Sequence, residues 1–221
     1  MDEGFSVFHD VFERHDVGRA GDELERALTA RSKAGARHVL SVPVVRALAT
    51  APALLRIAGG FVGGTPVPFR ATLFAKSPTA NWLVAWHQDT ALPLRERIVD
   101  PTWGPWSVKN GMTYAHAPAW ALERIVALRV HLDDSTASNG SLRVLPGTHR
   151  RGVLSDGDIH TLTRQLPAVK CLADAGGVVV MRPLIVHASS KATGSARRRV
   201  VHIEYVDDVR LAPGVELATT V

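Results

Sequence analysis

The chain is organised around the stretch Asn81-Trp82-Leu83-Val84-Ala85-Trp86-His87-Gln88-Asp89, an apolar run that ends with a histidine and an aspartate two positions apart. On an extended strand, side chains at i and i+2 point to the same face, so we expect His87 and Asp89 to project together. An imidazole beside a carboxylate is two-thirds of the facial triad that holds non-haem Fe(II) and leaves coordination positions open. The pair also fits a simple hydrogen bond at a strand end, so a third ligand has to come from elsewhere.

Length and composition describe an ordinary globular domain. The chain has 221 residues, of which 46% are hydrophobic and 21% charged, and no apolar run approaches the roughly 20 residues that cross a bilayer. The formal charge of +5 lacks the basic stripe of a nucleic-acid-binding face, so we interpret it as solubility and attraction for anionic small molecules. An acidic start and a single cysteine, Cys171, predict a cytoplasmic protein. We expect a small-molecule substrate, no nucleic-acid or membrane partner, and a monomer or homodimer.

Helix signals come first in the chain and strand signals follow. Helices are predicted over residues 21–28, after Ser41, and over residues 53–58. Short apolar runs between Gly/Pro turns then predict strands over residues 69–75, 82–87, 124–132, 141–145, 178–182 and 199–206. This order predicts a mainly β (α+β) fold in a single domain over residues 1–221, with a helical flank over 1–60 and an antiparallel sandwich or jelly-roll core over 61–210.

His187 is the favoured third ligand because of the residues around it. It ends the apolar run Leu184-Ile185-Val186, Ser189 follows on the same strand face, and Arg198 lies eleven residues later. An iron enzyme that activates dioxygen takes electrons from a co-substrate, and 2-oxoglutarate carries a distal carboxylate that an arginine fork binds well. A hairpin with His187 on one strand and Arg198 on the next would place both in one barrel mouth.

Other interpretations of these residues stay open at this point. His131 repeats the His-x-Asp spacing with Asp133, whereas His202 lies in the middle of a predicted strand and is typical of a packed core histidine. Arg198 has an alternative interpretation as a solvated member of a basic run, which is how we interpret its two arginine neighbours, Arg199 among them. From these residues alone, the third metal ligand is not decided.

Three blocks, in order along the chain, agree with one family signature. They are Trp86-His87-Gln88-Asp89, the strand and turn Asn139-Gly140-Ser141-Leu142-Arg143-Val144-Leu145-Pro146-Gly147-Thr148-His149, and His187-Ala188-Ser189 with Arg198. The chain thereby resembles the phytanoyl-CoA dioxygenase family of Fe(II)/2-oxoglutarate-dependent oxygenases, from about Phe69 to Tyr205. The middle block is the most specific part of the resemblance because it is separate from the metal ligands.

The resemblance implies a double-stranded β-helix, the cupin-like form of the jelly roll. It implies that iron is held by His87, Asp89 and His187. Related halogenases lack the carboxylate, so the presence of Asp89 favours hydroxylation. His131 and Asp133 fall where the family places no ligand, and we therefore expect them to have structural roles.

The same resemblance implies Fe(II), 2-oxoglutarate and O2 as cofactor and co-substrates. Arg198 would anchor 2-oxoglutarate, and Ser189 would hydrogen-bond the same carboxylate. Leu73 and Arg129 fall where the family lines the co-substrate pocket. The expected reaction is hydroxylation of an unactivated C–H bond in a small metabolite, with release of succinate and CO2.

Residues 91–120 form a long segment with little periodicity, several prolines and three tryptophans. In this fold the segment would cover the barrel mouth, so we predict a lid-like insertion in which Trp103, Trp106, Arg97 and Lys109 contact the substrate. The alternative is that the aromatic side chains pack within the segment and the charges are solvated.

Two other functional classes fit part of the pattern. A cupin-like metal enzyme that does not use 2-oxoglutarate would keep the three metal ligands but would not need Arg198. A non-catalytic β-barrel binding protein would tolerate the loss of all four residues.

Overall fold

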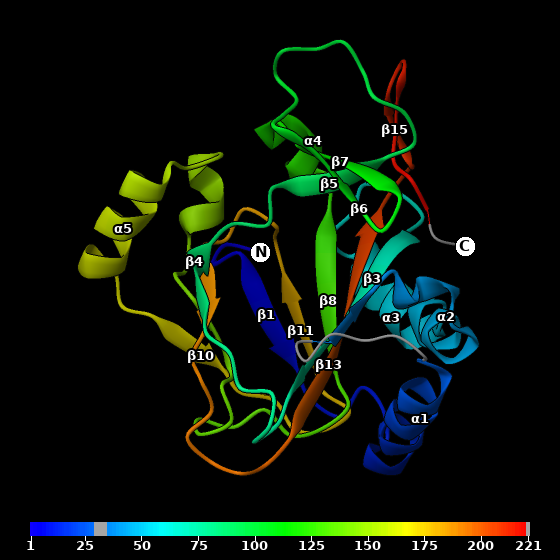
Figure 1. Cartoon of the computed structure of the whole chain (residues 1–221), viewed down its shortest axis with the longest axis vertical. Helices are drawn as coiled ribbons and strands as arrows, with labels where there is room; N and C mark the ends of the chain where they lie inside the picture. Colours follow the sequence, from blue (N-terminus) through cyan, green and yellow to red (C-terminus); the bar gives the residue numbers. More distant parts are fainter. Residues whose placement is uncertain (29–34, 220–221) are drawn as a thin grey trace.

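Two antiparallel sheets face each other in the computed structural model, which describes residues 1–28 and 35–219 (Figure 1). The large sheet has the strand order β1-β11-β8-β13-β3-β2, and the small sheet has the order β10-β9-β12-β4. The large sheet consists of β1 Phe5–Phe8, β2 Gly35–Arg37, β3 Val67–Lys76, β8 Val126–His131, β11 Val178–Met181 and β13 Arg198–Val206. The small sheet consists of β4 Val84–His87, β9 Leu142–Val144, β10 Val169–Cys171 and β12 His187–Ser189. This arrangement is the jelly-roll, double-stranded β-helix that the sequence predicts.

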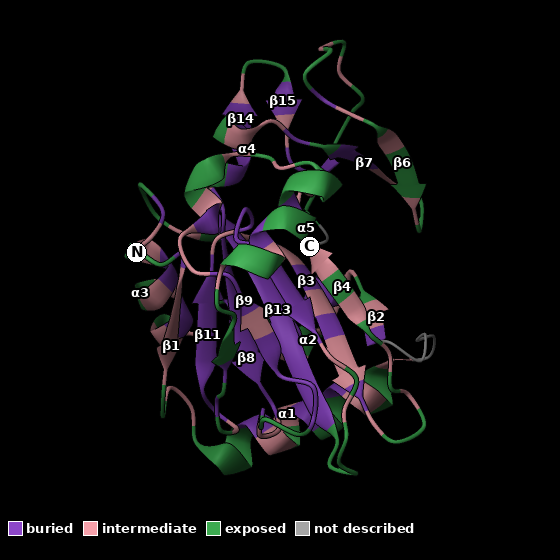
Figure 2. Ribbon diagram, turned by 90° about the vertical axis from the view of Figure 1, so that its left-hand side faces the viewer, coloured by how far each residue is buried: buried purple, intermediate pink, exposed green. Residues whose placement is uncertain are grey.

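The long strand β13 gives the large sheet one apolar face and one polar face. It pairs along its length with β3 and β8, and its successive side chains alternate between the two faces. Val201 and Ile203 join the hydrophobic cluster beneath the helices, whereas Arg198 and His202 point into the space between the sheets. Figure 2 shows β13 and its neighbour β8 in the purple of buried residues. The polar face of the sheet is therefore enclosed within the barrel.

Three helices cover the outer face of the large sheet (Figure 1). They are α1 Arg14–Ala27, α2 Pro43–Ala49 and α3 Pro52–Gly59, with a short 3-10 helix at Val39–Ser41 before α2. α2 and α3 each begin with a proline, which fits a first turn where the backbone N–H has no partner in the helix. Leu24, Val45 and Leu54 of these helices are buried in the cluster, and Tyr205 Oη donates a hydrogen bond to Ala49 O at 2.9 Å.

Residues 1–60 also supply two strands, which the prediction of a helical flank did not include. β1 pairs with β11 from Phe5 opposite Met181 to Phe8 opposite Val178, and β2 pairs with β3. Strands of four and three residues are too short for an alternating pattern to stand out from the flanking loops. Both edges of the large sheet therefore come from the part of the chain that was expected to be helical.

Arg199 joins α1 to the large sheet, although its basic neighbours led us to expect a solvated side chain. It follows Arg198 on β13, so alternation turns it toward the helices, where it is 2% exposed. Its guanidinium donates to Asp133 at 2.8 and 2.9 Å and to Asp22 of α1 at 2.9 Å. Paired charge-assisted hydrogen bonds to two elements hold α1 against the end of the sheet.

The outer face of the small sheet is covered by α5 Asp156–Gln165, which we had not predicted. Ile159 and Leu162 of this helix pack against Trp86 of β4. The sequence does contain its start signal, because Ser155 and Asp158 form a capping box with reciprocal side-chain and backbone hydrogen bonds.

Residues 91–120, which the sequence predicted to be irregular, contain a small sheet of their own. Its strands are β5 Ala91–Leu94, β6 Trp106–Lys109 and β7 Met112–His116, in the order β5-β7-β6, and they are followed by α4 Ala119–Glu123. The hairpin of β14 Arg210–Ala212 and β15 Val215–Glu216 lies at the same end of the barrel (Figure 1). Leu92, Trp103 and Leu217 share one buried cluster there. We call residues 91–120 the cap, because this cluster packs them onto the end of the barrel.

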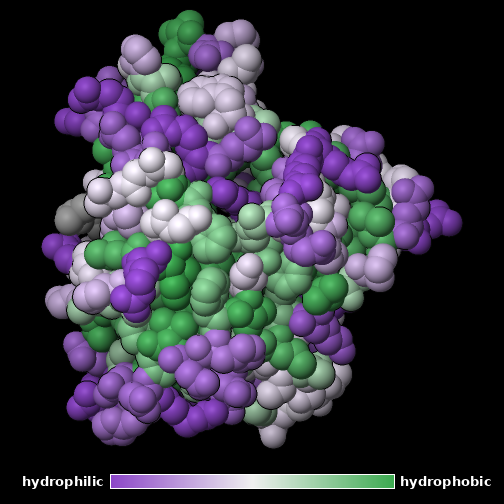
Figure 3. Space-filling model, turned by 180° about the vertical axis from the view of Figure 1, so that it is seen from behind, coloured by the Kyte–Doolittle hydropathy of each residue, from purple (hydrophilic) through white to green (hydrophobic). Residues whose placement is uncertain are grey.

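The face of the molecule seen in Figure 3 has a hydrophobic region in its middle, with hydrophilic side chains around it. A hollow between β1 and α3 is bordered by Phe8, Val11, Ile57 and Phe61, which are partly buried against the cluster beneath the helices.

Within the described residues, no helix has the length and apolar character needed to cross a membrane.

Candidate metal centre and its cavity

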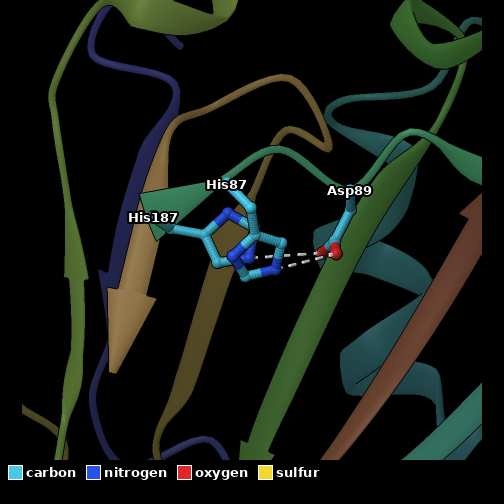
Figure 4. A group of neighbouring side chains, drawn as sticks. All are labelled: His87, Asp89 and His187. Atoms are coloured by element: carbon cyan, nitrogen blue, oxygen red, sulfur yellow. Dashed lines mark ion pairs between the residues drawn. The ribbon is translucent and has the colours of Figure 1, made fainter. Parts of the chain in front are cut away.

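Three side chains of the metal-binding type converge at one point between the sheets. His87 ends β4 and His187 begins β12, and the two residues lie directly opposite each other in the antiparallel pair, with ring centroids 4.2 Å apart. Asp89 lies just beyond β4, where its backbone N–H donates to Pro183 O at 2.9 Å. Figure 4 shows both imidazoles turned toward the carboxylate. Asp89 Oδ1 is 3.6 Å from His87 Nε2, and Asp89 Oδ2 is 3.4 Å from His187 Nε2.

The backbone fixes the orientation of both imidazoles in the same way. His87 Nδ1 lies 2.8 Å from Ala85 O, and His187 Nδ1 lies 2.9 Å from Ile185 O. A carbonyl oxygen only accepts hydrogen bonds, so each ring carries a proton on Nδ1 and, in its neutral form, directs an unprotonated Nε2 toward Asp89. This is the tautomer that a metal-binding histidine needs, with the second nitrogen held by an outer partner.

The donor set fits a divalent transition metal. The ligand atoms of His87, Asp89 and His187 all lie within 4.8 Å of one another. Metal–ligand bonds of about 2.1 Å place neighbouring ligand atoms about 3 Å apart, close to the 3.4 and 3.6 Å separations between nitrogen and oxygen. Two imidazoles and one carboxylate on one side of a metal form the facial triad typical of non-haem Fe(II), which leaves the other positions free.

Burial and the mutual contacts of the three side chains together set the charge state of this group. Burial lowers the pKa of His187 to about 4, although the carboxylate of Asp89 opposes the effect. Burial alone would raise the pKa of Asp89, but His187 and His87 hold it well below its usual value. At neutral pH, His187 is therefore a neutral imidazole and Asp89 an anion, which are the forms that bind a metal without first releasing a proton. Burial would lower the pKa of His87, but its contact with Asp89 raises it.

The rival pair, His131 and Asp133, does not form a second centre of this kind. His131 is buried with neither ring nitrogen hydrogen-bonded, while Asp133 binds Arg199. Burial, with additional effects from Arg129 and Arg198, lowers the pKa of His131 to about 3. His131 is thus a neutral histidine inside the barrel wall.

This burial predicts a specific dependence of stability on pH. A histidine with a depressed folded-state pKa takes up its proton more readily when unfolded, so its contribution to stability is complete above about pH 6.5 and declines as the pH falls toward 3. When the pH falls from 7.5 to 5, we expect the free energy of unfolding to decrease by about 2 kcal/mol less in His131→Leu than in the wild type. Urea unfolding at the two pH values measures this difference. His160→Leu, which removes an exposed histidine, provides the control for the loss of a histidine. The same pH dependence in His131→Leu as in the wild type would contradict the prediction.

Three buried cations lie on β3, β8 and β13 without a carboxylate partner among the described residues. Arg198 lies opposite Lys76 in the β13–β3 pair, and Arg129 lies opposite His202 in the β13–β8 pair. The exposed fractions of Arg198, Lys76 and Arg129 are 2%, 1% and 7%. Arg198 Nη1 and Arg129 Nε form no hydrogen bond. Buried charge without a counter-charge is costly, so this cationic cluster favours the binding of an anion.

The pKa values show that the members of the cationic cluster repel one another. Burial, with Arg198 and Arg129, lowers the pKa of Lys76 to about 8, and burial with Arg129 lowers that of Arg198 to about 9. The charge of Arg129 also acts on Asp89 and His187. The cluster therefore extends from Arg198 to the neighbourhood of the metal group.

Ser189 lies at the edge of this cluster, but its hydroxyl group already has partners. Its Oγ donates to Gly140 O at 2.7 Å and accepts from Lys76 Nζ at 2.7 Å. Arg198 Nε donates to Asn139 O at 3.3 Å. The Asn139-Gly140 turn thus positions both Ser189 and Arg198.

Lys76 was not predicted from the sequence, because its place opposite Arg198 depends on a strand register that no local pattern reveals.

His187 and Arg198 do not lie on the two strands of one hairpin, which was the expectation from the sequence. β12 pairs with β9 and β4 in the small sheet, whereas β13 pairs with β3 and β8 in the large sheet. The segment between them crosses from one sheet to the other, as connections in a jelly roll do. The two residues therefore reach the barrel interior from opposite walls.

A cavity of about 910 Å³ opens beside the metal group and is lined in part by His87 and Asp89. Other lining residues are Arg37, Thr72, Phe74, Trp82, Lys109 and His202. Arg70 also borders the cavity, but its guanidinium is paired with the buried Glu204 and donates to Ala91 O at 2.9 Å. The cavity thus combines an aromatic part with a positively charged part.

Of the four residues predicted to contact substrate, Lys109 lines this cavity and the other three do not. Trp103 is buried in the cluster that packs the cap onto the barrel. Trp106 packs against the same cluster, and the guanidinium carbon of Arg97 lies 5.2 Å from its ring centroid. These three residues therefore fit the alternative interpretation, in which side chains of residues 91–120 pack within the segment and do not contact the substrate.

The residues predicted for the co-substrate pocket have different positions. Leu73 borders the cavity, but its side chain belongs to the cluster beneath the helices, since Thr72 and Phe74 take the inner face of β3. Arg129 is buried within the cationic cluster, and its Nη1 lies 3.1 Å from Nδ1 of His202. His202, which we interpreted as a core histidine, lines the cavity instead.

The family model described as phytanoyl-CoA dioxygenase matches residues 5–200 of the chain, which includes the small sheet, the large sheet up to the start of β13, and all the residues of the metal group and the cationic cluster. The chain belongs to the phytanoyl-CoA dioxygenase family. The L-proline trans-4-hydroxylase of Streptomyces griseoviridis is 26% identical to this family member over 180 residues. The match covers 70% of this chain and 59% of the hydroxylase, so the chain spans about three-fifths of the length of that relative.

Several solved structures share the fold of this phytanoyl-CoA dioxygenase family member. AviO1 from Streptomyces viridochromogenes has a TM-score of 0.68 at 24% identity, with 98% of this chain and 93% of that chain covered. EctD from S. alaskensis, solved with 2-oxoglutarate and 5-hydroxyectoine, has a TM-score of 0.71 at 21% identity, with 93% and 72% covered. The non-heme alpha ketoglutarate dependent epimerase SnoN has a TM-score of 0.69 at 18% identity, with 99% and 82% covered. At these identities the likeness establishes the double-stranded β-helix.

Proposed function

We propose that the protein is an Fe(II)- and 2-oxoglutarate-dependent dioxygenase that hydroxylates an unactivated C–H bond of a small metabolite and releases succinate and CO2. One observation carries the proposal: a His-Asp-His facial group and a buried, unpaired cationic cluster share the interior of one barrel. The first suits the metal, and the second suits a dicarboxylate co-substrate. Membership of the family and the hydroxylase activity of a relative support the proposal.

The residues divide into two binding roles. His87, Asp89 and His187 would hold the metal through two Nε2 atoms and a carboxylate oxygen. Arg198 and Lys76 would bind the distal carboxylate of 2-oxoglutarate, whose charge would neutralise part of the cationic cluster. When bound, Fe(II) and 2-oxoglutarate supply the reduction of O2, coupled to decarboxylation of the keto acid and to hydroxylation of the substrate C–H bond.

The other residues of the site orient these groups and exclude water. The carbonyl groups of Ala85 and Ile185 keep the two imidazoles in the tautomer that binds metal. Phe74 and Trp82 give an apolar wall to the cavity that His87 and Asp89 also line, and this wall favours a dry environment for the substrate. Asn110 of the cap also borders the cavity, and this supports the predicted role of residues 91–120 as a cover for the barrel mouth.

Anaerobic titration of the purified protein with Fe(II) and 2-oxoglutarate tests this proposal. We expect the weak visible charge-transfer band of an iron–2-oxoglutarate complex only when both components are present, at one iron per chain. Iron binding without any band or any 2-oxoglutarate affinity would indicate the cupin-like enzyme instead. A protein that binds neither component would be the non-catalytic barrel, and the proposal would be wrong.

A further inference from the structure

Two cations at the mouth of the cavity have no acidic partner among the described residues. Arg37 is the last residue of β2 and Lys109 the last residue of β6, and both line the cavity that contains His87 and Asp89. Neither cation forms an ion pair within the described part of the chain, whereas Arg70 beside them is paired with Glu204. The positive charge of Arg37 and Lys109 is therefore available to a bound molecule.

Lys109 is held in place by a tight hairpin. Asn110 and Gly111 form the two-residue turn between β6 and β7, with φ of 51° and 76°, and Lys109 pairs with Met112. An Asn-Gly turn with both residues in the left-handed region is the preferred geometry for such a hairpin. The Lys109 ammonium lies 5.0 Å from the ring centroid of Tyr114. The lysine thus has a defined direction and does not extend freely into solvent.

Arg37 lies at the outer end of a polar row that crosses the large sheet. In register, Arg37 lies opposite Thr72, Thr72 lies opposite His202, and His202 lies opposite Arg129. Residues directly opposite each other on neighbouring strands share one face of the sheet, so this row follows the cavity wall. Arg37 occupies the mouth, and Arg129 occupies the cationic cluster inside the barrel. Two separate positive regions therefore exist, one at each end of the row.

The mouth region has the electrostatic character of an anion site. Burial lowers the pKa of Lys109, and the neighbouring charges of Arg37 and Arg70 lower it further. Asp89 is the acidic residue that lines the same cavity, and it belongs to the metal group. A bound anion at the mouth would relieve the repulsion between Lys109 and Arg37 without competing with an internal carboxylate.

We propose that Arg37 and Lys109 bind an anionic group of the substrate, a carboxylate or a phosphate, so that the substrate is a negatively charged small molecule. The identity of this molecule as the substrate rests on the proposed function, while the anion site itself rests on the geometry above. Phe74 and Trp82 line the cavity and suit an apolar or ring-shaped body next to the anionic group.

Binding of benzoate, phenyl phosphate and benzamide to the metal-free full-length protein tests the proposal. The three probes share one ring and differ in their head group, and isothermal calorimetry measures their affinities. We expect at least one anion to bind about tenfold or more tightly than benzamide, and Lys109→Met and Arg37→Met each to weaken that binding by about tenfold. The tighter of the two anions identifies the head group as carboxylate or phosphate.

Two matched variants locate the binding. Arg97→Met removes a cap cation outside the cavity, and Arg198→Met removes a cation from the interior cluster; both should retain binding of the anion. The proposal is overturned if benzamide binds as tightly as the anions, if no probe binds, or if Arg198→Met abolishes binding while Lys109→Met and Arg37→Met do not. Far-UV circular dichroism checks that each variant is folded. No metal is present in this assay, so a failure of the proposed function appears separately, in the titration with Fe(II) and 2-oxoglutarate.

Discussion

His187→Ala should lose Fe(II) binding and, with it, almost all hydroxylation. His187 is one of three metal ligands that the protein would supply. It comes from β12, whereas His87 ends β4 and Asp89 lies just beyond that strand. Loss of an outer partner of a metal ligand already costs roughly 10- to 100-fold in affinity, so loss of the ligand itself should cost more. Iron per chain after anaerobic loading and desalting measures the first effect, and succinate release measures the second.

Two comparisons make this result specific. His160→Ala removes an exposed histidine of α5 and should keep one iron per chain. His131→Leu removes the rival histidine and should also keep the iron, because neither ring nitrogen of His131 meets a partner in the barrel wall. Wild-type iron binding in His187→Ala, or loss of iron in His131→Leu in its place, would show that the metal ligands have been assigned wrongly.

The parts of the fold that could be predicted are the strands that lie in apolar runs between turn residues. They include the long strands β3, β8 and β13 and the shorter strands β4, β9 and β11. The short strands β1, β2, β10 and β12 have no such pattern, and they are defined by the neighbours with which they pair. In the cap, Pro93 and Pro105 interrupt the sequence pattern, although the strand pairing of β5, β6 and β7 is regular.

The site was predictable to the extent that its residues are close in sequence. The spacing of His87 and Asp89 is local, and an extended strand places them together whatever the rest of the chain does. His187 was favoured by the residues around it, but only the resemblance of the chain to a family made it the expected third ligand, because its position opposite His87 depends on pairing between β12 and β4. Lys76 and Arg37 were missed for the same reason: each gains its role from a register with a distant strand. Arg97 and Trp106 were predicted to contact the substrate from their residue types alone, and in the structure they pack against each other in the cap.

Arg198→Met should weaken 2-oxoglutarate binding by about 10- to 100-fold while the affinity for Fe(II) stays near that of the wild type. The lost interaction is a charge-assisted one in a buried place, whereas the metal ligands belong to other strands. Lys76→Met should have a smaller effect, because its ammonium group is already bonded to Ser189 and Ser190. Calorimetric titration of the Fe(II)-loaded proteins with 2-oxoglutarate, under anaerobic conditions, measures both effects.

The stability of Arg198→Met separates an anion-binding role from a purely structural one. Without 2-oxoglutarate, the variant should be at least as stable as the wild type, because it removes a buried charge that is repelled by Arg129 and has no carboxylate partner. With saturating 2-oxoglutarate, the wild type should be the more stable protein, since a ligand adds stability in proportion to the logarithm of its concentration relative to its dissociation constant. Urea unfolding with and without 2-oxoglutarate measures this reversal. If the variant is less stable in both conditions, the bond from Arg198 to Asn139 O matters more than the charge, and the co-substrate anchor has to be sought elsewhere.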